Sequence, residues 1–132
     1  MHKITDCKII KIPTITDPRG NLGVLEHGVF PYDFKRVYYL FDVPSGAFRG
    51  GHSHKEQQEF LIALSGSFEV TLQDKGGNEK TIMLNKPNEG LLITTNIWRE
   101  LGNFSSGSVC LVLSSGTFNE TDYIRDYNAF MK

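Results

Sequence analysis

Cysteine is scarce in this sequence of 132 residues, which contains only Cys7 and Cys110. Both lie in apolar, strand-like segments, so we expect two buried thiols in a reducing compartment rather than a disulfide. The first residues lack the long apolar region of a secretory signal peptide. No run approaches the roughly 18 consecutive apolar residues that a membrane-spanning helix needs. These absences predict a cytoplasmic protein without a membrane segment.

Neither sign of charge is in excess. The sequence has 14 Lys and Arg against 15 Asp and Glu, a formal net charge of -1. This balance argues against nonspecific binding to nucleic acid or to a membrane surface. The length fits a single domain over residues 1–132, large enough to form a core without disulfide or metal support.

Helical periodicity is also rare, and 13 glycines and 5 prolines separate short apolar runs. We predict strands at 7–12, 22–26, 35–42, 60–64, 67–73, 79–84, 90–94, 97–101 and 108–114. Only residues 119–132 suggest a helix, with Asn119 or Thr121 as its N-cap. Many short strands between turns are typical of a β-sandwich or β-barrel. The fold class is therefore all-β with a short C-terminal helix.

The stretch RGGHSHKEQQEFLIALSG, residues 49–66, contains two histidines and a glutamate. His52 and His54 are two positions apart, so in a strand they point to the same face. The glycines before them leave room for a ligand to approach the backbone. Such a pair can bind a metal together with Glu59, transfer protons at neutral pH, or simply pack as ordinary histidines.

The spacing of five residues in this region resembles the first signature of the cupin superfamily: Gly46, His52, His54, Glu59 and Gly66. The resemblance implies a jelly-roll barrel, the double-stranded β-helix. In metal-binding cupins the two histidines and the glutamate are ligands, and a second signature supplies another histidine. The corresponding segment here, 87–103, contains no histidine. We therefore expect no metal, although three protein ligands suffice for some catalytic metals.

A closer resemblance covers nearly the whole chain. The sequence is similar to the cupin-type sugar 3,4-ketoisomerases that act on dTDP-4-oxo-6-deoxyglucose, through the segments DPRGNLGVLE (17–26), FKRVYYLFDVP (34–44), RGGHSHK (49–55), LSGSFEVTLQD (64–74), GLLITTNIWREL (90–101) and LVLSS with DYIRDYNAF (122–130). The resemblance implies transfer of a carbonyl from C4 to C3 of a 6-deoxyhexose through an enediol, without a metal or other cofactor.

The resemblance also implies roles for residues of this chain. His52 and His54 would divide the proton transfers, with the base left unassigned. Tyr38 would hold a sugar oxygen or shuttle a proton. The candidate substrate-binding residues are Arg19, Arg36, Arg49, Trp98 and Arg99. Guanidinium groups suit a diphosphate, whereas core packing is an equally good explanation of Trp98.

Several alternatives remain open at this point. Glu59 stands where family members often carry Gln, which keeps a metal-dependent isomerase or epimerase using His52, His54 and Glu59 in consideration. A non-catalytic nucleotide-sugar-binding cupin is the third possibility. The configuration of the product at C4, galacto or gluco, is not assigned. We expect a homodimer, because the apolar run 7–12 is a candidate exposed edge strand that a second subunit could cover.

Overall fold

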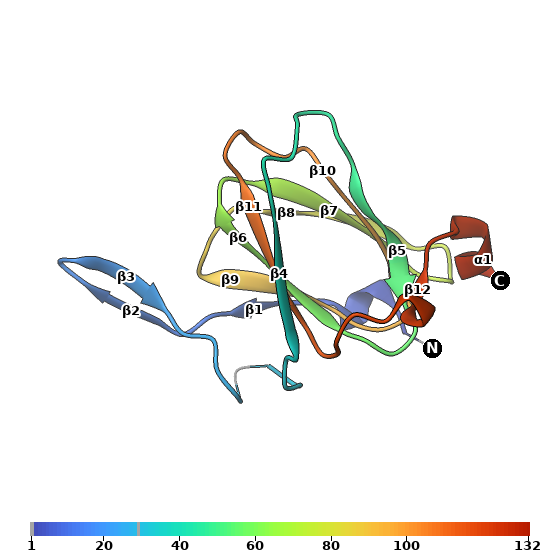
Figure 1. The fold of residues 1–132 in the computed structure, drawn as a ribbon, viewed down its shortest axis with the longest axis horizontal. Helices are drawn as coiled ribbons and strands as arrows, with labels where there is room; N and C mark the ends of the chain where they lie inside the picture. The colour runs from blue at the N-terminus through green and yellow to red at the C-terminus, as the bar shows by residue number, and fades with distance from the viewer. Residues whose placement is uncertain (1, 29) are drawn as a thin grey trace.

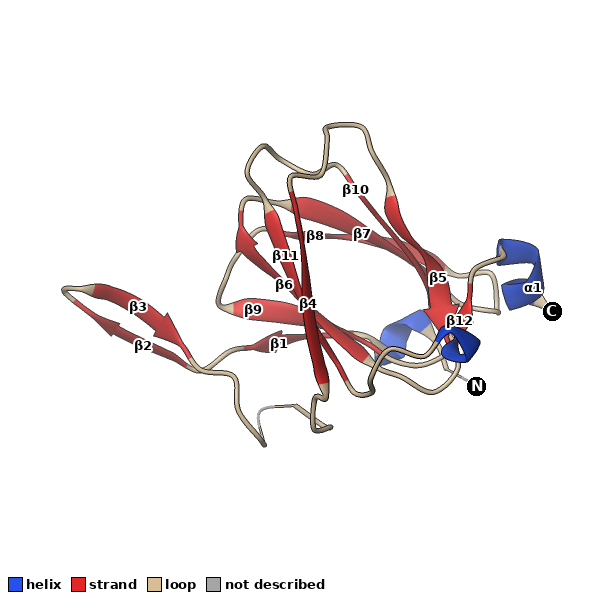
Figure 2. Ribbon diagram, in the orientation of Figure 1, coloured by secondary structure: helices blue, strands red, loops and turns tan. Residues whose placement is uncertain are grey.

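Two antiparallel sheets face each other in the computed structural model, which describes residues 2–28 and 30–132 (Figures 1 and 2). The first sheet has the strand order β1-β9-β6-β11-β4 and the second β12-β5-β10-β7-β8. The strands are β1 (Lys8–Lys11), β2 (Thr14–Asp17), β3 (Gly20–Gly23), β4 (Arg36–Phe41), β5 (Arg49–His54), β6 (Glu59–Ser65), β7 (Phe68–Gln73), β8 (Glu79–Leu84), β9 (Glu89–Ile93), β10 (Trp98–Gly102), β11 (Val109–Ser114) and β12 (Tyr123–Ile124). The predicted cupin jelly roll is confirmed.

The core lies between the two sheets and follows from strand alternation. In β7, Phe68, Val70 and Leu72 are fully buried, while the residues between them are partly exposed. Side chains of the facing sheet complete this cluster, among them Leu61, Leu91, Ile93, Cys110 and Val112. Cys110 is buried and Cys7 partly buried, and both are free thiols as expected.

The edge strand β4 brings polar groups into one end of the barrel. Its residues alternate strictly between partly buried and exposed. Arg36 and Tyr38 point inward, whereas Val37, Tyr39 and Phe41 are at least half exposed on the outer face. An apolar outer face on an edge strand is unusual for an isolated monomer, because such strands template association.

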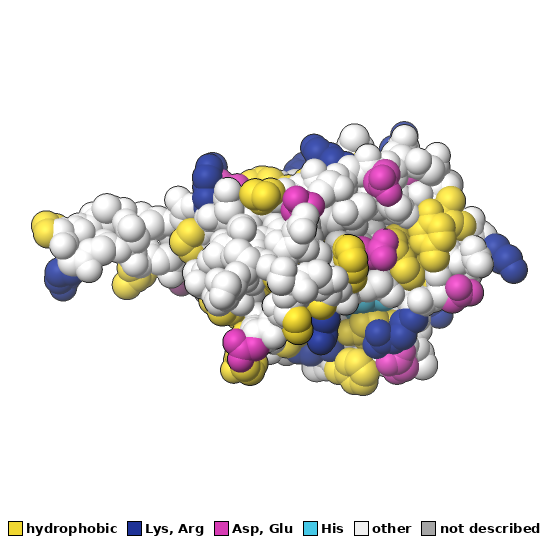
Figure 3. Space-filling view, turned by 90° about the horizontal axis from the view of Figure 1, so that it is seen from above, with side chains coloured by type: hydrophobic (Ala, Val, Ile, Leu, Met, Phe, Trp, Pro, Cys, Tyr) yellow, Lys and Arg dark blue, Asp and Glu magenta, His cyan; other side chains and the backbone are white. Residues whose placement is uncertain are grey.

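A β-hairpin of β2 and β3 extends away from the barrel, as both viewing directions show (Figures 1 and 3). The register pairs Asp17 with Gly20, so Pro18 and Arg19 form a two-residue turn. Gly20 adopts φ +125°, a conformation open to glycine. The predicted strand 22–26 was therefore misplaced, and β2 was not predicted. Neither face of this hairpin packs on the barrel, so its residues lack the alternating burial on which strand prediction depends.

The C-terminal segment also differs from prediction. Asn119 caps a 3₁₀ turn, η2 (Glu120–Asp122), by accepting a hydrogen bond from the Thr121 backbone amide. The chain then pairs with β5 as β12, and only α1 (Tyr127–Met131), capped by Asp126, is α-helical. The pairing of Tyr123 with His54 uses backbone groups that a continuous helix would have used itself. A second 3₁₀ turn, η1 (Ile4–Asp6), precedes β1.

Within the described residues, none of the helical segments has the length and apolar character required to cross a bilayer.

Candidate active site

A cavity of about 260 Å³ lies between the two sheets, beside their edge strands β4 and β12. It is lined from six strands and from the residues after β12: Arg36, Tyr38, Leu40, Arg49, Gly50, His52, Glu59, Leu61, Arg99, Leu101, Val112, Tyr123 and Arg125. In the space-filling view a histidine side chain is visible among basic and apolar side chains (Figure 3). The lining combines charged and polar side chains with the aliphatic side chains of Leu40, Leu61, Leu101 and Val112.

The two histidines lie on one face of β5, as the strand period predicts. Their ring centroids are 4.8 Å apart and their planes meet at 86°, an edge-to-face arrangement. His52 lines the cavity and is 8% exposed, whereas His54 lies behind it and is fully buried. His52 is therefore the imidazole that a ligand in the cavity can contact directly.

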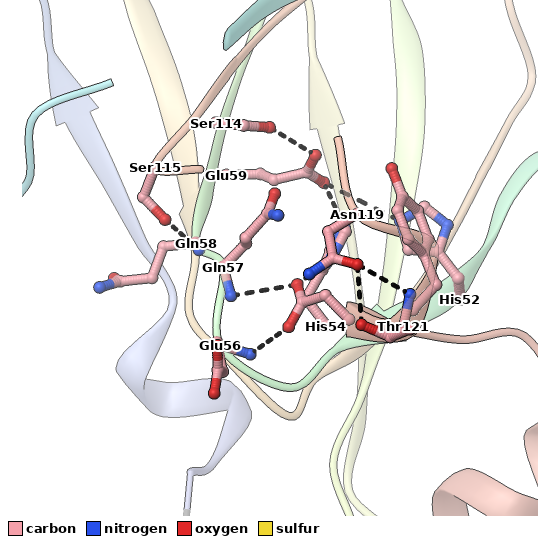
Figure 4. A network of polar contacts seen from close by, with 12 residues as sticks. His52, His54, Glu56, Gln57, Gln58, Glu59, Ser114, Ser115, Asn119 and Thr121 are labelled. Atoms are coloured by element: carbon pink, nitrogen blue, oxygen red, sulfur yellow. Dashed lines mark hydrogen bonds and ion pairs between the residues drawn. The ribbon is translucent and has the colours of Figure 1, made fainter. Parts of the chain in front are cut away.

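Glu59 begins β6 and is the centre of a buried hydrogen-bond network (Figure 4). Its Oε1 accepts from Nη1 of Arg99 at 2.7 Å. Its Oε2 accepts from the Tyr38 hydroxyl at 2.6 Å and from the Ser114 hydroxyl at 2.9 Å. Each oxygen of this carboxylate therefore has at least one strong donor, as a buried charge requires.

The ionised form of Glu59 is favoured although the side chain is only 2% exposed. Burial alone would raise the pKa of this carboxyl, but the contacts of His52 and His54 and the Arg99 charge together hold the pKa well below its usual range. Nε2 of His54 lies 3.5 Å and Nε2 of His52 3.9 Å from Oε1, longer than hydrogen bonds. Arg99, at 2.7 Å, is thus the closest cationic partner.

His52 is held in its neutral form. Burial lowers the pKa of its imidazole to about 4, the nearby Glu59 carboxylate opposes this effect, and the Arg99 charge adds to it. At neutral pH the ring therefore carries one hydrogen and one lone pair. Its Nε2 is buried and has no hydrogen-bond partner among the described residues.

Tyr38 stays a phenol. Burial and the adjacent Glu59 charge raise the pKa of its hydroxyl far above the ordinary value. The hydroxyl donates to Glu59, so Tyr38 positions that carboxylate while its ring lines the cavity.

Four arginines line the cavity: Arg36 and Arg99 at its inner wall, and the exposed Arg49 and Arg125 at its rim. Arg36 lies 5.0 Å above the Tyr38 ring, and its Nη2 makes long contacts of 3.2 to 3.4 Å to Gln57, Ser114 and Tyr123. Arg49 lies at the start of β5, and Arg125 follows β12. Arg125 forms a bidentate pair with Glu120 and stacks 4.2 Å from the Tyr123 ring.

The structure thus gathers most of the residues singled out in the sequence around one cavity: His52, Tyr38, Arg36, Arg49 and Arg99, with His54 directly behind. Trp98 is not among the lining residues. It is 5% exposed and packs against Tyr127 and Phe130 of α1, the core position that was the alternative explanation. The reason is strand alternation, since Arg99 points inward and its neighbour Trp98 must point outward.

Arg19 is also absent from the cavity of its own chain. It lies at the turn of the β2–β3 hairpin, where its guanidinium pairs with Asp17 at 2.7 Å. Three contributors were not recognised from sequence as site residues: Ser114, Tyr123 and Arg125. No local spacing marks them, because they reach the site through the long-range pairing of β11 and β12.

The group His52, His54 and Glu59 has the composition of a metal site, with one ligand atom from each within 4.8 Å of the others. Its surroundings do not fit a divalent ion. The Glu59 oxygens already accept from Arg99, Tyr38 and Ser114. A metal would have to displace the Arg99 guanidinium or lie beside its positive charge. The arrangement favours proton transfer over metal binding.

Comparison with known proteins agrees with this geometry. The family model described as "FdtA: WxcM-like, C-terminal" matches residues 5–132. A TDP-4-oxo-6-deoxy-α-D-glucose-3,4-oxoisomerase of Aneurinibacillus thermoaerophilus is 41% identical over 126 residues, covering 95% of this chain and 90% of that protein.

Two solved structures are similarly close. A 3,4-ketoisomerase from Helicobacter canadensis is 46% identical with a TM-score of 0.91, over 96% of this chain and 95% of its own. A mutant of the 3,4-ketoisomerase QdtA from Thermoanaerobacterium thermosaccharolyticum, in complex with TDP-4-keto-6-deoxyglucose, is 41% identical with a TM-score of 0.92, over 95% and 91%. The chain therefore belongs to the FdtA family, as its resemblance to the sugar 3,4-ketoisomerases predicts.

Proposed function

We propose that this protein is a nucleotide-sugar 3,4-ketoisomerase that converts TDP-4-oxo-6-deoxyglucose to a TDP-3-oxo-6-deoxyhexose. The observation that carries the proposal is His52, a neutral imidazole that lines a cavity with a cationic rim and whose Nε2 has no hydrogen-bond partner among the described residues. The substrate class follows from the family relatives, one of which is solved in complex with TDP-4-keto-6-deoxyglucose.

The reaction needs only two proton shifts. A base removes the proton from C3, which the adjacent C4 ketone acidifies, and an enediol or enediolate forms. Delivery of a proton to C4 and transfer of the O3 proton to O4 leave a ketone at C3 and a hydroxyl at C4. No electron leaves or enters the sugar overall, so the step balances without a redox partner.

His52 is the base in this proposal, and His54 supports it from behind. A low imidazole pKa keeps His52 unprotonated in the free enzyme. Once the enediolate forms, its negative charge stabilises the new imidazolium in a site shielded from water, so proton uptake is favoured at that stage. His54, fully buried, cannot reach the sugar unless the site rearranges.

The inner arginines would stabilise the negative charge that develops on the sugar oxygens. Arg36 has only long contacts at Nη2, and its Nε has no partner among the described residues, so its donors are available. The Arg99 guanidinium is already bound to Glu59 and to the Ile97 carbonyl. Arg99 would contribute mainly charge, and Tyr38 would hold the carboxylate that fixes it.

The rim arginines would bind the diphosphate. Arg49 and Arg125 both line the cavity, and guanidinium groups match phosphate oxygens in bidentate geometry. The contacts with Glu120 and with the Tyr123 ring already fix the Arg125 side chain, so it loses little conformational entropy when the diphosphate binds.

We also propose a homodimer, with each chain a single cytoplasmic domain, since the family model spans residues 5–132 and both thiols are free. Two exposed features support the dimer: the Ile15–Leu22 pair of the hairpin and the outer face of β4. β1 is an edge strand, as expected from the sequence. For Arg19 to contact substrate, the hairpin of one subunit would have to reach the cavity of the other.

Proton NMR of metal-stripped protein mixed with TDP-4-oxo-6-deoxyglucose tests this function. We expect a 3-oxo product without added metal, and the coupling of the C4 proton names its configuration. Product formation only after a divalent ion is added would instead support the metal-dependent isomerase. Binding of TDP with no product would indicate a non-catalytic nucleotide-sugar-binding cupin.

A further inference from the structure

Asp122 is a buried carboxylate whose contacts converge on one of the two histidines. It ends the 3₁₀ turn η2 and is 5% exposed. One oxygen, Oδ2, lies 2.9 Å from Nδ1 of His54. The other, Oδ1, accepts from the Glu56 backbone amide at 2.7 Å, and Gln57 N lies 3.3 Å from Oδ2. All three partners belong to the end of β5 and the turn that follows it.

The chemistry of these donors fixes the hydrogen on the imidazole. Backbone amides can only donate, so the carboxylate acts as an acceptor for the Glu56 and Gln57 amides. An ionised carboxylate has no hydrogen to give to His54, so the hydrogen of that contact belongs to Nδ1 of the imidazole. A neutral His54 then has its lone pair on Nε2.

Nε2 of His54 faces the catalytic cluster. It has no hydrogen-bond partner among the described residues, and it lies 3.5 Å from Oε1 of Glu59. The same Glu59 oxygen is 3.9 Å from Nε2 of His52. Tyr123 packs its ring 4.4 Å from the His54 ring on a further side. The orientation and hydrogen of His54 therefore affect Glu59 and His52 directly.

We propose that Asp122 is a positioning residue of the active site: its carboxylate holds a hydrogen on Nδ1 of His54 and thereby aims Nε2 at Glu59 and the base His52. This inference rests on the proposed function. It gives a role in catalysis to η2, which contains Asp122 and is held beside β5 by the pairing of Tyr123 in β12 with His54.

The substitution Asp122→Asn reverses the hydrogen bond. The carbonyl of the new amide side chain would keep the short contact to the Glu56 amide, which leaves the NH₂ group facing Nδ1 of His54. An NH₂ group can only donate, so the hydrogen of a neutral His54 would move to Nε2. We expect kcat to fall about 10- to 100-fold, a loss of the size seen when a metal-ligating histidine loses the partner that orients it, with little change in the Kd for TDP.

Two measurements test the proposal. Nitrogen-15 NMR of the imidazoles, assigned by the spectrum of His54→Asn, should show Nδ1 of His54 protonated in the wild type and Nε2 protonated in Asp122→Asn. Turnover and TDP binding are then measured on the same samples. The matched control is Asp33→Asn, which alters the exposed Asp33–His27 pair and should leave turnover unchanged.

An unprotonated Nδ1 on His54 in the wild type would overturn the proposal. Unchanged turnover in Asp122→Asn, or equal losses of TDP binding and turnover in that variant, would also overturn it. If Asp122→Asn does not fold, the wild-type spectrum alone decides. The spectrum needs no sugar substrate. If the assigned reaction is wrong, no turnover will be detected with any variant, but the tautomer of His54 can still be measured.

Discussion

At the scale of single residues, the main finding is the unequal environment of two neighbouring histidines. His52 lines the cavity and its Nε2 has no hydrogen-bond partner among the described residues, whereas His54 is enclosed by Asp122, Glu59 and Tyr123. Two residues of the same type, two positions apart, thus receive different roles from the elements packed on them.

The pH dependence of catalysis should report the low pKa of His52. Protonation inactivates a base, and its pKa of about 4 means that the free enzyme keeps an unprotonated base well below the ordinary imidazole value of about 6.5. We expect kcat/KM to stay level as the pH falls from about 8 to about 6 and to decline only nearer 4. Circular dichroism at each pH serves as the control for folding. A midpoint close to the ordinary imidazole value would contradict the assignment.

Arg125 should act on the diphosphate and not on the nucleoside. We expect Arg125→Ala to weaken TDP binding about 10-fold, the effect of losing one charge-assisted hydrogen bond. Thymidine binding should be unchanged. Isothermal titration with both ligands measures this, with Lys80→Ala on the outer strand β8 as control. An equal loss for thymidine would show that Arg125 merely supports the fold.

At the scale of elements, the strands of the two main sheets were predicted except β5 and β12, and the hairpin and the C-terminal segment were not predicted correctly. β7 alternates between buried and exposed residues in a way that sequence reveals directly. The β2–β3 hairpin has no buried face, and β12 exists only because its two residues pair with His54 and Ser53, far earlier in the chain. Long-range pairing of this kind leaves no local periodicity to detect.

One close contact between strands allows an element-level prediction. A Cβ on Gly90 of β9 would lie 2.5 and 2.7 Å from ring atoms of Phe60 and 2.8 Å from the Leu61 carbonyl oxygen. We expect Gly90→Ala to lower the free energy of unfolding by about 1–3 kcal/mol through overpacking.

Urea denaturation measures that change. The matched control is Gly23→Ala, because the added Cβ would meet only Ile12 at 3.7 Å, an ordinary contact. Equal midpoints for the two variants would show that the β6–β9 contact can relax.

At the scale of the whole molecule, the site residues predicted from sequence divide by their place in the fold. His52 and His54 of β5 were found because strand alternation and the cupin spacing mark them. The arginines and Tyr38 of β4, β5 and β10 were named from the resemblance to the sugar 3,4-ketoisomerases. Trp98 does not line the cavity, because it neighbours Arg99 in β10 and therefore points to the opposite face. Arg19 does not line the cavity of its own chain, because it lies at the turn of the β2–β3 hairpin. Asp122, which is not among the candidate site residues named from the sequence, contacts His54.

Mixing two inactive variants tests whether the site is shared between subunits. We expect Arg19→Ala and His52→Asn each to lose turnover as pure proteins. If the hairpin completes the partner's cavity, heterodimers contain one intact site, and refolding an equal mixture should restore roughly a quarter of the wild-type sites. Light scattering gives the mass of each sample. A monomeric mass, or no recovery in confirmed heterodimers, would contradict the shared site.

If His52 removes the C3 proton of the sugar, the exchange of that proton with solvent depends on His52. Metal-stripped wild type and His52→Asn are each incubated with TDP-4-oxo-6-deoxyglucose in deuterated buffer, and the C3 proton signal is followed by NMR. We expect that signal to disappear with the wild type and to persist with His52→Asn, while both proteins bind TDP equally. Exchange at the wild-type rate in His52→Asn would contradict it.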